Sequence, residues 1–201
     1  MKLFYSPGAC SLSPHIALRE AGLDFELVKV DLKTKTTEHG ADFTQINPYG
    51  YVPALQLDNG EVLLEGPAIV QYIADQVAGN QLAPMNGTIE RYRVQSALTF
   101  INSELHKTIG SLFNPTLTDA VRQATVEKID TRLKQLSAQM DGKDWIANGR
   151  FSVADPYLFV VLGWLKHFKI DVGQWPVLKA HADRLAARPA VQAALQAEGL
   201  A

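Results

Sequence analysis

The first 80 residues alternate between short apolar runs and stretches with helical spacing. Apolar runs at residues 2–5 and 25–30 predict two strands, and the apolar positions of residues 12–20 predict a helix between them. Pro14 fits this helix only in its first turn, where a missing N–H is harmless. Residues 31–41 are polar and predict a loop.

The clearest turn signal is Asp58-Asn59-Gly60, which separates apolar runs at residues 52–57 and 61–64. We expect these runs to form an antiparallel hairpin, and residues 67–77 to form the helix that follows. The order strand, helix, strand, helix, strand, strand, helix predicts an α/β domain with a mixed four-stranded sheet.

Residues 78–88 are rich in Gly, Pro and Asn, and the pattern beyond them is almost entirely helical. The predicted helices cover residues 89–109, 119–140, 151–168, 177–187 and 190–197. We therefore expect two domains, at residues 1–80 and 88–201, of which the second is all-helical. The apolar helix at 151–168 has a marginal membrane length, but Asp155, Lys166 and His167 favour a core helix of a soluble protein.

The composition is that of a globular protein without a polyanionic partner. Of the 201 residues, 47% are hydrophobic and 20% are charged, which excludes a disordered chain. The net charge of −2 gives no reason to expect nucleic acid or an anionic membrane as a partner. Neither a signal peptide nor a membrane span is predicted, so we expect a cytoplasmic protein. The histidines show no metal-ligand spacing, and no metal is expected.

The single cysteine, Cys10, lies between the first predicted strand and helix. One cysteine excludes an intramolecular disulfide. Because the start of a helix favours an anion, Cys10 could be an activated thiol, or its pocket could stabilise the thiolate of another molecule. It could also form a mixed disulfide with a small thiol. The alternative is a buried, unreactive cysteine.

Two further segments suit a small, peptide-like zwitterion. A cis bond at Val52-Pro53 would expose the Val52 N–H and C=O to a ligand, whereas the alternative is an ordinary edge proline. Glu65-Gly66-Pro67 leads into a helix, whose free N–H groups accept a carboxylate while Glu65 accepts an ammonium. The alternative is that Glu65 only favours the helix dipole.

Thr99, Ser103 and His106 share a polar stripe of the predicted helix 89–109. His106 could donate a hydrogen bond to a thiolate, or it could be an ordinary surface residue.

Ser152-Val153-Ala154-Asp155 is a capping box, which marks a helix start rather than chemistry. Pro156 should forfeit one early hydrogen bond of that helix.

The ordered set of these motifs resembles the bacterial beta-class glutathione transferases over essentially the whole chain. The matching segments are Lys2-Leu3-Phe4-Tyr5 with Pro7-Gly8-Ala9-Cys10-Ser11, Asn47-Pro48 with Val52-Pro53-Ala54-Leu55, Glu65-Gly66-Pro67-Ala68-Ile69 with Gln71-Tyr72, Glu104-Leu105-His106, and the capping box before Asp155. The resemblance implies a thioredoxin-like N-terminal domain, an all-helical C-terminal domain, a homodimer, and glutathione as the co-substrate.

The resemblance also implies which residues meet glutathione. Cys10 and His106 would face its sulfur, Lys35 would meet its glycine carboxylate, and Val52, before the cis-proline Pro53, would pair with its cysteinyl backbone. The γ-glutamyl end and the helical side of the site would involve Glu65, Gly66, Thr99, Ser103, Glu104 and Leu105, with Glu104 reaching the γ-glutamyl amine across the dimer.

Two residues depart from common family patterns. Many members have Ser where this chain has Gly66, and the lost hydroxyl should weaken the carboxylate contact by roughly 0.5–1.5 kcal/mol. Thr99 stands where some members have Asn, so a side-chain amide contact is in doubt.

The expected function is conjugation of the glutathione thiolate to small hydrophobic electrophiles. One alternative is another glutathione-dependent reaction: reduction of mixed disulfides or peroxides through Cys10, dehalogenation or isomerisation. A second is a non-catalytic protein that sequesters hydrophobic ligands. The presence of Cys10, Lys35, Glu65 and His106 together argues against the non-catalytic protein, since a scaffold needs none of them.

Overall fold

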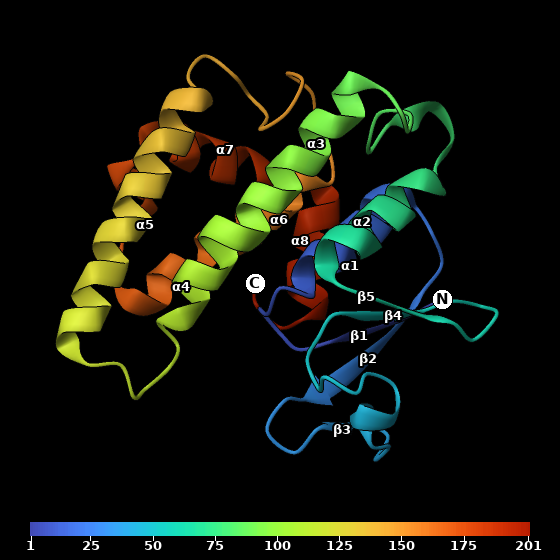
Figure 1. The fold of residues 1–201 in the computed structure, drawn as a ribbon. Helices are drawn as coiled ribbons and strands as arrows, with labels where there is room; N and C mark the ends of the chain where they lie inside the picture. Colours follow the sequence, from blue (N-terminus) through green and yellow to red (C-terminus); the bar gives the residue numbers. More distant parts are fainter. The chain divides into compact units, whose positions relative to one another are not determined.

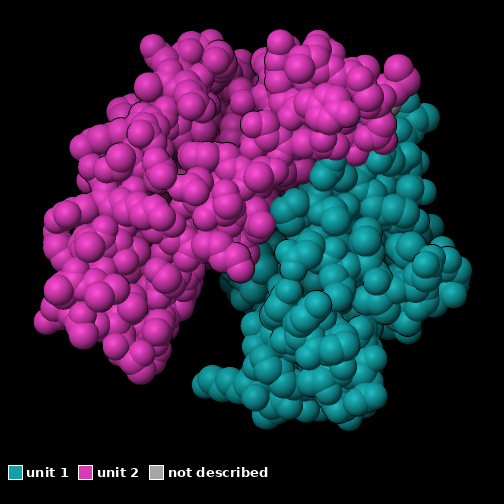
Figure 2. All heavy atoms as spheres, viewed as in Figure 1, with its two compact units in different colours: residues 1–84, 187–201 teal, residues 85–186 magenta. Residues whose placement is uncertain are grey.

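The computed structural model describes residues 1–79 and 81–201, and it divides into two compact units (Figure 2). The first unit contains residues 1–84 and 187–201, and the second contains residues 85–186. The C-terminal segment thus packs with the N-terminal part of the chain, which the sequence pattern does not reveal. The predicted domain ranges, 1–80 and 88–201, remain a prediction; residue 80 of the proposed linker lies outside the described residues.

The first unit is built on a mixed sheet of five strands in the order β3-β2-β1-β4-β5 (Figure 1). The strands are β1 (Lys2–Tyr5), β2 (Glu26–Asp31), β3 (Thr36–Thr37), β4 (Ala54–Gln56) and β5 (Val62–Leu64). β1 pairs with β2 in parallel, and the other neighbours are antiparallel. The prediction of four strands was wrong by one, because β3 has two residues and is too short to show alternation.

Three helices of the first unit lie together in Figure 1: α1 (Leu12–Ala21), α2 (Gly66–Asp75) and α8 (Pro189–Ala197). Pro14 falls in the first turn of α1, as expected. The helix predicted between the second and third strands is only a 3₁₀ turn, Phe43–Gln45.

The sheet buries side chains on both of its faces. Phe4 and Val28 are paired across β1 and β2 and belong to one cluster with Phe43, which is fully buried. Leu3 and Leu55 are also paired and fully buried, and alternation directs them to the opposite face. The short turn at Phe43 therefore closes one face of the sheet. Together these features form the thioredoxin-like arrangement that the resemblance implies.

The second unit is helical. Its α-helices are α3 (Ile89–Phe100), α4 (Lys107–Ser111), α5 (Asp119–Gln139), α6 (Ala154–Gly163) and α7 (Pro176–Ala186). The predicted helix at 89–109 is continuous but irregular, because a π-helical turn, Ile101–His106, joins α3 to α4. The predicted helix at 151–168 begins later, at α6, and ends as a 3₁₀ turn, Trp164–Phe168. Among the described residues, no helix has both the length and the hydropathy to cross a membrane.

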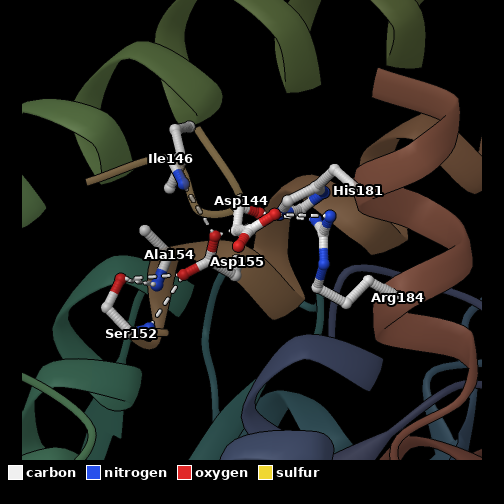
Figure 3. Close-up of polar contacts among 7 residues, drawn as sticks. All are labelled: Asp144, Ile146, Ser152, Ala154, Asp155, His181 and Arg184. Carbon is white, nitrogen blue, oxygen red and sulfur yellow. Dashed lines mark hydrogen bonds and ion pairs between the residues drawn. The ribbon is translucent and has the colours of Figure 1, made fainter. Parts of the chain in front are cut away.

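The predicted capping box lies at the start of α6 (Figure 3). Asp155 is fully buried, and its carboxylate accepts hydrogen bonds from the backbone N–H groups of Ser152 and Ile146 at 2.8 and 2.9 Å. His181 of α7 lies 3.0 Å from the same carboxylate, so Asp155 also joins two helices. Pro156 cannot bond the Ser152 carbonyl, which instead accepts the Asp155 N–H at 3.0 Å.

Candidate functional site

Cys10 lies in the turn between β1 and α1, next to Ser11, which precedes the helix. Its partly buried thiol donates to the carbonyl oxygen of Val52 at 3.3 Å. The Val52–Pro53 bond is cis, as the resemblance implies. The structure therefore brings together two predicted site residues, Cys10 and Val52, and places the thiol against the backbone just before the β4–β5 hairpin.

A buried network from the C-terminus holds the turn before Cys10. The Gly8 N–H donates to Glu198 Oε2 at 2.9 Å, and Glu198 Oε1 lies 2.8 Å from His15 Nδ1. Arg19 Nε donates to His15 Nε2 at 2.9 Å, so that nitrogen has a lone pair and the ring is neutral. His15 therefore donates its Nδ1 proton to Glu198.

Lys35 lies in the loop between β2 and β3 with a positive φ of 58°. Its Nζ donates to the Gly50 carbonyl at 2.7 Å, so the ammonium lies close to the backbone that leads to Val52. Asp31, the last residue of β2, accepts the N–H of Lys33 at 2.8 Å. This backbone hydrogen bond lowers the pKa of Asp31, whose carboxylate therefore stabilises the loop.

Glu65 is an exposed residue immediately before α2, and its backbone φ of 69° is rare for any residue other than glycine. Its Oε1 accepts the Tyr51 hydroxyl at 2.8 Å, and this bond to a carboxylate raises the pKa of Tyr51. Gly66 is the first residue of α2, and a Cβ added there would meet only Pro53, at 3.9 Å. A serine at position 66 would therefore fit the space.

The other predicted residues belong to the second unit. Thr99 and Ser103 are exposed, and Thr99 donates to the Gln95 carbonyl at 2.8 Å. Glu104 accepts from Arg132 of α5 at 2.8 Å. Leu105 is fully buried inside the π-helical turn Ile101–His106, so its side chain belongs to the core.

His106 is the last residue of the π-helical turn and is partly buried. Its Nδ1 lies 2.6 Å from the Tyr157 hydroxyl, which donates to Asn102 at 2.9 Å. The Trp164 ring contacts the His106 ring edge to face, with centroids 4.8 Å apart. Since a π-turn is wider than an α-turn, His106 is rotated away from the position that the regular stripe with Thr99 and Ser103 assumed.

An aromatic cluster adjoins His106. Phe113 is 52% exposed, although its ring packs edge to face against Trp164 and Phe168, with ring centroids 6.1 and 4.7 Å apart. An exposed ring of this size, held edge to face by others, is suited to a flat apolar ligand.

Sequence reasoning missed three polar partners of the predicted residues: Tyr51, Arg132 and Tyr157. A signal existed for Tyr157, because a tyrosine in an apolar helix needs a partner for its hydroxyl. No local pattern indicates the other two. Among the described residues, no group of three or more His, Cys, Asp or Glu could hold a metal ion.

Comparisons with known proteins agree with the fold and the motifs. The family model described as Glutathione S-transferase, N-terminal domain matches residues 8–76, and the one described as Glutathione S-transferase, C-terminal domain matches residues 100–189. The chain is 46% identical to Glutathione S-transferase GstA of Escherichia coli O157:H7, with 100% of both chains covered.

Solved structures are similar over the same extent. The bacterial beta class glutathione S-transferase of Sphingomonas chungbukensis is 53% identical, with a TM-score of 0.96 and 100% of both chains covered. A sphingomonad glutathione S-transferase complexed with glutathione is 54% identical, also with a TM-score of 0.96 and 100% of both chains covered. Because both family models match and the likeness extends over the whole length, the chain belongs to the glutathione S-transferase family, within its bacterial beta class.

Proposed function

We propose that this enzyme conjugates the thiolate of glutathione to small hydrophobic electrophiles. The observation that carries the proposal is the group of side chains in the first unit around the Val52–Pro53 bond. Cys10 bonds the Val52 carbonyl, and Lys35 and Glu65 bond the segment immediately before it. The protein thus offers a thiol, a cation and an anion to a ligand that has a thiol, an anionic group and a cationic group. None of the alternative functions gains comparable support.

Glutathione has two carboxylates, one ammonium, two amides and a thiol, and each has a complementary group here. Lys35 binds the glycine carboxylate, and the Val52 backbone pairs with the cysteinyl amide in the manner of a strand. Glu65 binds the γ-glutamyl ammonium, and the Gly66 N–H at the start of α2 binds the adjacent carboxylate.

His106 accepts the thiol proton, and the start of α1 near Cys10 stabilises the resulting anion. The thiolate then attacks the electrophilic carbon and displaces its leaving group. Each unit of lowered thiol pKa represents about 1.4 kcal/mol of stabilisation of the thiolate. Cys10 supplies a second reaction, in which its thiolate attacks the disulfide of oxidised glutathione, forms a mixed disulfide with one glutathione and releases the other as a thiolate. The chain has no second cysteine to resolve this mixed disulfide.

The second unit contributes the electrophile side. Phe113, Trp164 and Phe168 form an apolar surface next to His106, which favours flat hydrophobic substrates. Thr99 and Ser103 line the polar part. We also propose a cytoplasmic homodimer, in which Glu104 exchanges its bond with Arg132 for the γ-glutamyl ammonium.

The test is retention of the purified protein on immobilised glutathione, followed by turnover of a chloronitroaromatic substrate with and without glutathione. Binding with turnover is expected. The Cys10→Ala variant should lose any disulfide exchange but keep part of the conjugation activity, and Lys35→Met should bind glutathione more weakly. A folded protein that binds no glutathione would refute the proposal.

A further inference from the structure

The hydroxyl of Tyr157 connects two residues of the π-helical turn. It donates to Asn102 Oδ1 at 2.9 Å, and its oxygen lies 2.6 Å from His106 Nδ1. Tyr157 comes from α6 and is only 3% exposed, so its hydroxyl bonds protein groups rather than bulk water. Two side chains of one turn are therefore tied to a neighbouring helix through a single buried oxygen.

The direction of these bonds determines where the His106 ring carries its proton. A phenol has one proton, and here it goes to the Asn102 oxygen. The Tyr157 oxygen is then an acceptor, so His106 Nδ1 must carry a proton. In a neutral imidazole only one nitrogen is protonated, and the lone pair is therefore on Nε2.

We propose that Tyr157 and Asn102 are positioning residues that hold His106 in its Nδ1–H tautomer, so that Nε2 is the atom that receives the glutathione thiol proton. The inference rests on the proposed function. In this step the S–H bond breaks, an N–H bond forms at Nε2, and the thiolate keeps the electron pair. The imidazolium returns its proton to solvent after the thiolate has displaced the leaving group.

Aromatic contacts keep the ring in the same orientation. The Trp164 ring meets His106 at 4.8 Å and 72°, and the Tyr157 ring meets it at 5.8 Å and 83°. Trp164 is 7% exposed and so belongs to the packed interior. A ring turned over between these two neighbours would lose its bond to the hydroxyl.

The tautomer is measured directly by nitrogen-15 NMR of the histidine side chains at a pH where the ring is neutral. The His106→Gln variant identifies the His106 signals. We expect a protonated Nδ1 and an unprotonated Nε2 in the native enzyme, without glutathione. The Tyr157→Phe variant should give a mixture of both tautomers, whereas Tyr92→Phe, an exposed control in α3, should give the native pattern. Protonation of Nε2 in the native neutral ring would overturn the inference.

Two variants of Asn102 test the direction of the bonds. Asn102→Asp still accepts from Tyr157, so the Nδ1–H tautomer should persist, whereas Asn102→Leu should weaken the preference. If the Asn102 amide instead donated to the Tyr157 oxygen, the native ring would be protonated on Nε2, and the aspartate would reverse the tautomer. That reversal would refute the proposed direction.

Activity separates positioning from a structural role. Loss of a partner that orients a metal-binding histidine typically costs about tenfold to a hundredfold, and we expect kcat/KM of Tyr157→Phe to fall by a similar factor while the Kd of glutathione stays the same. Asn102→Asp should retain more activity than Asn102→Leu. Unchanged kcat/KM in Tyr157→Phe would refute the positioning role, and unchanged kcat/KM in His106→Gln would refute the proposed function of His106 itself.

Discussion

Replacement of Glu198 tests whether the C-terminus holds the turn that carries Cys10. Glu198 is 6% exposed, and its two oxygens bond His15 and the Gly8 N–H at 2.8 and 2.9 Å. The carboxylate is compensated by Arg19 through the neutral His15 ring. The Glu198 side chain is fully buried, so its removal leaves two donors without an acceptor and costs more than the loss of a surface bond.

The two obvious variants differ in magnitude. Glu198→Gln keeps the shape of the side chain and one accepting oxygen, but its NH₂ group then faces one of the two donors, the Gly8 N–H or His15 Nδ1. We therefore expect the free energy of unfolding to fall by about 1.5–3 kcal/mol. Glu198→Ala leaves the donors of His15 and Gly8 without an acceptor, and we expect a loss of about 3–5 kcal/mol. The exposed control Glu127→Gln should change stability by less than about 0.5 kcal/mol.

The assay is urea unfolding at one protein concentration, combined with amide hydrogen exchange of residues 8–11. The slope with urea should remain the same, so that the midpoint reports stability. Exchange should become faster in the turn around Cys10 and in α8, because these segments share the lost bonds. A Glu198→Gln variant that is as stable as the control, with native exchange in the turn, would refute the reasoning.

Three further predictions concern the first unit. Gly66→Ser should bind glutathione about two- to tenfold more tightly in calorimetry, because the space is open and a hydroxyl donor is gained. Tyr51→Phe should raise the glutathione Kd about fivefold, since Glu65 loses the bond that orients it, with little change in stability. The Lys33 N–H lowers the pKa of Asp31 in the folded protein below its unfolded pKa of about 3.9. The stabilisation that the Asp31 carboxylate gives to the folded state is therefore complete above the unfolded pKa and is lost as pH falls through the lower folded pKa. Amide exchange in its loop should rise in that acid window, whereas Asp31→Asn should show no such dependence.

Much of the secondary structure can be predicted from the sequence, because its causes are local. The Asn59-Gly60 turn, the helix start after Cys10 and the capping box at Asp155 each depend on residues within a few positions of one another. The structure confirms all three. The strand β3 was missed because two residues cannot show alternation, and the helix predicted before the third strand is only the three-residue 3₁₀ turn at Phe43.

Some residues of the candidate site could be predicted from the sequence, but their contacts could not. Cys10 and Glu65 could be proposed from their positions at predicted helix starts, whereas Lys35 comes only from the resemblance to the family. Their partners cannot be read from the sequence: Val52 is 42 positions from Cys10, and Tyr157 is 51 positions from His106. Such pairs form only when strands and helices have packed.

The hydrophobic repeats and turn residues therefore determine which segments are strands and helices, since these depend on backbone geometry over a few residues. Tertiary packing decides the rest: that the C-terminus supports the turn of Cys10, that the Tyr51 hydroxyl orients Glu65, and that a π-turn presents His106 to Tyr157. Each of these contacts joins groups that are far apart in the chain. Folding partly buries the Gly8–Glu198 and His106–Tyr157 pairs and so reduces the competition from water, whereas the exposed Tyr51–Glu65 bond depends on the fold only to bring its two groups together.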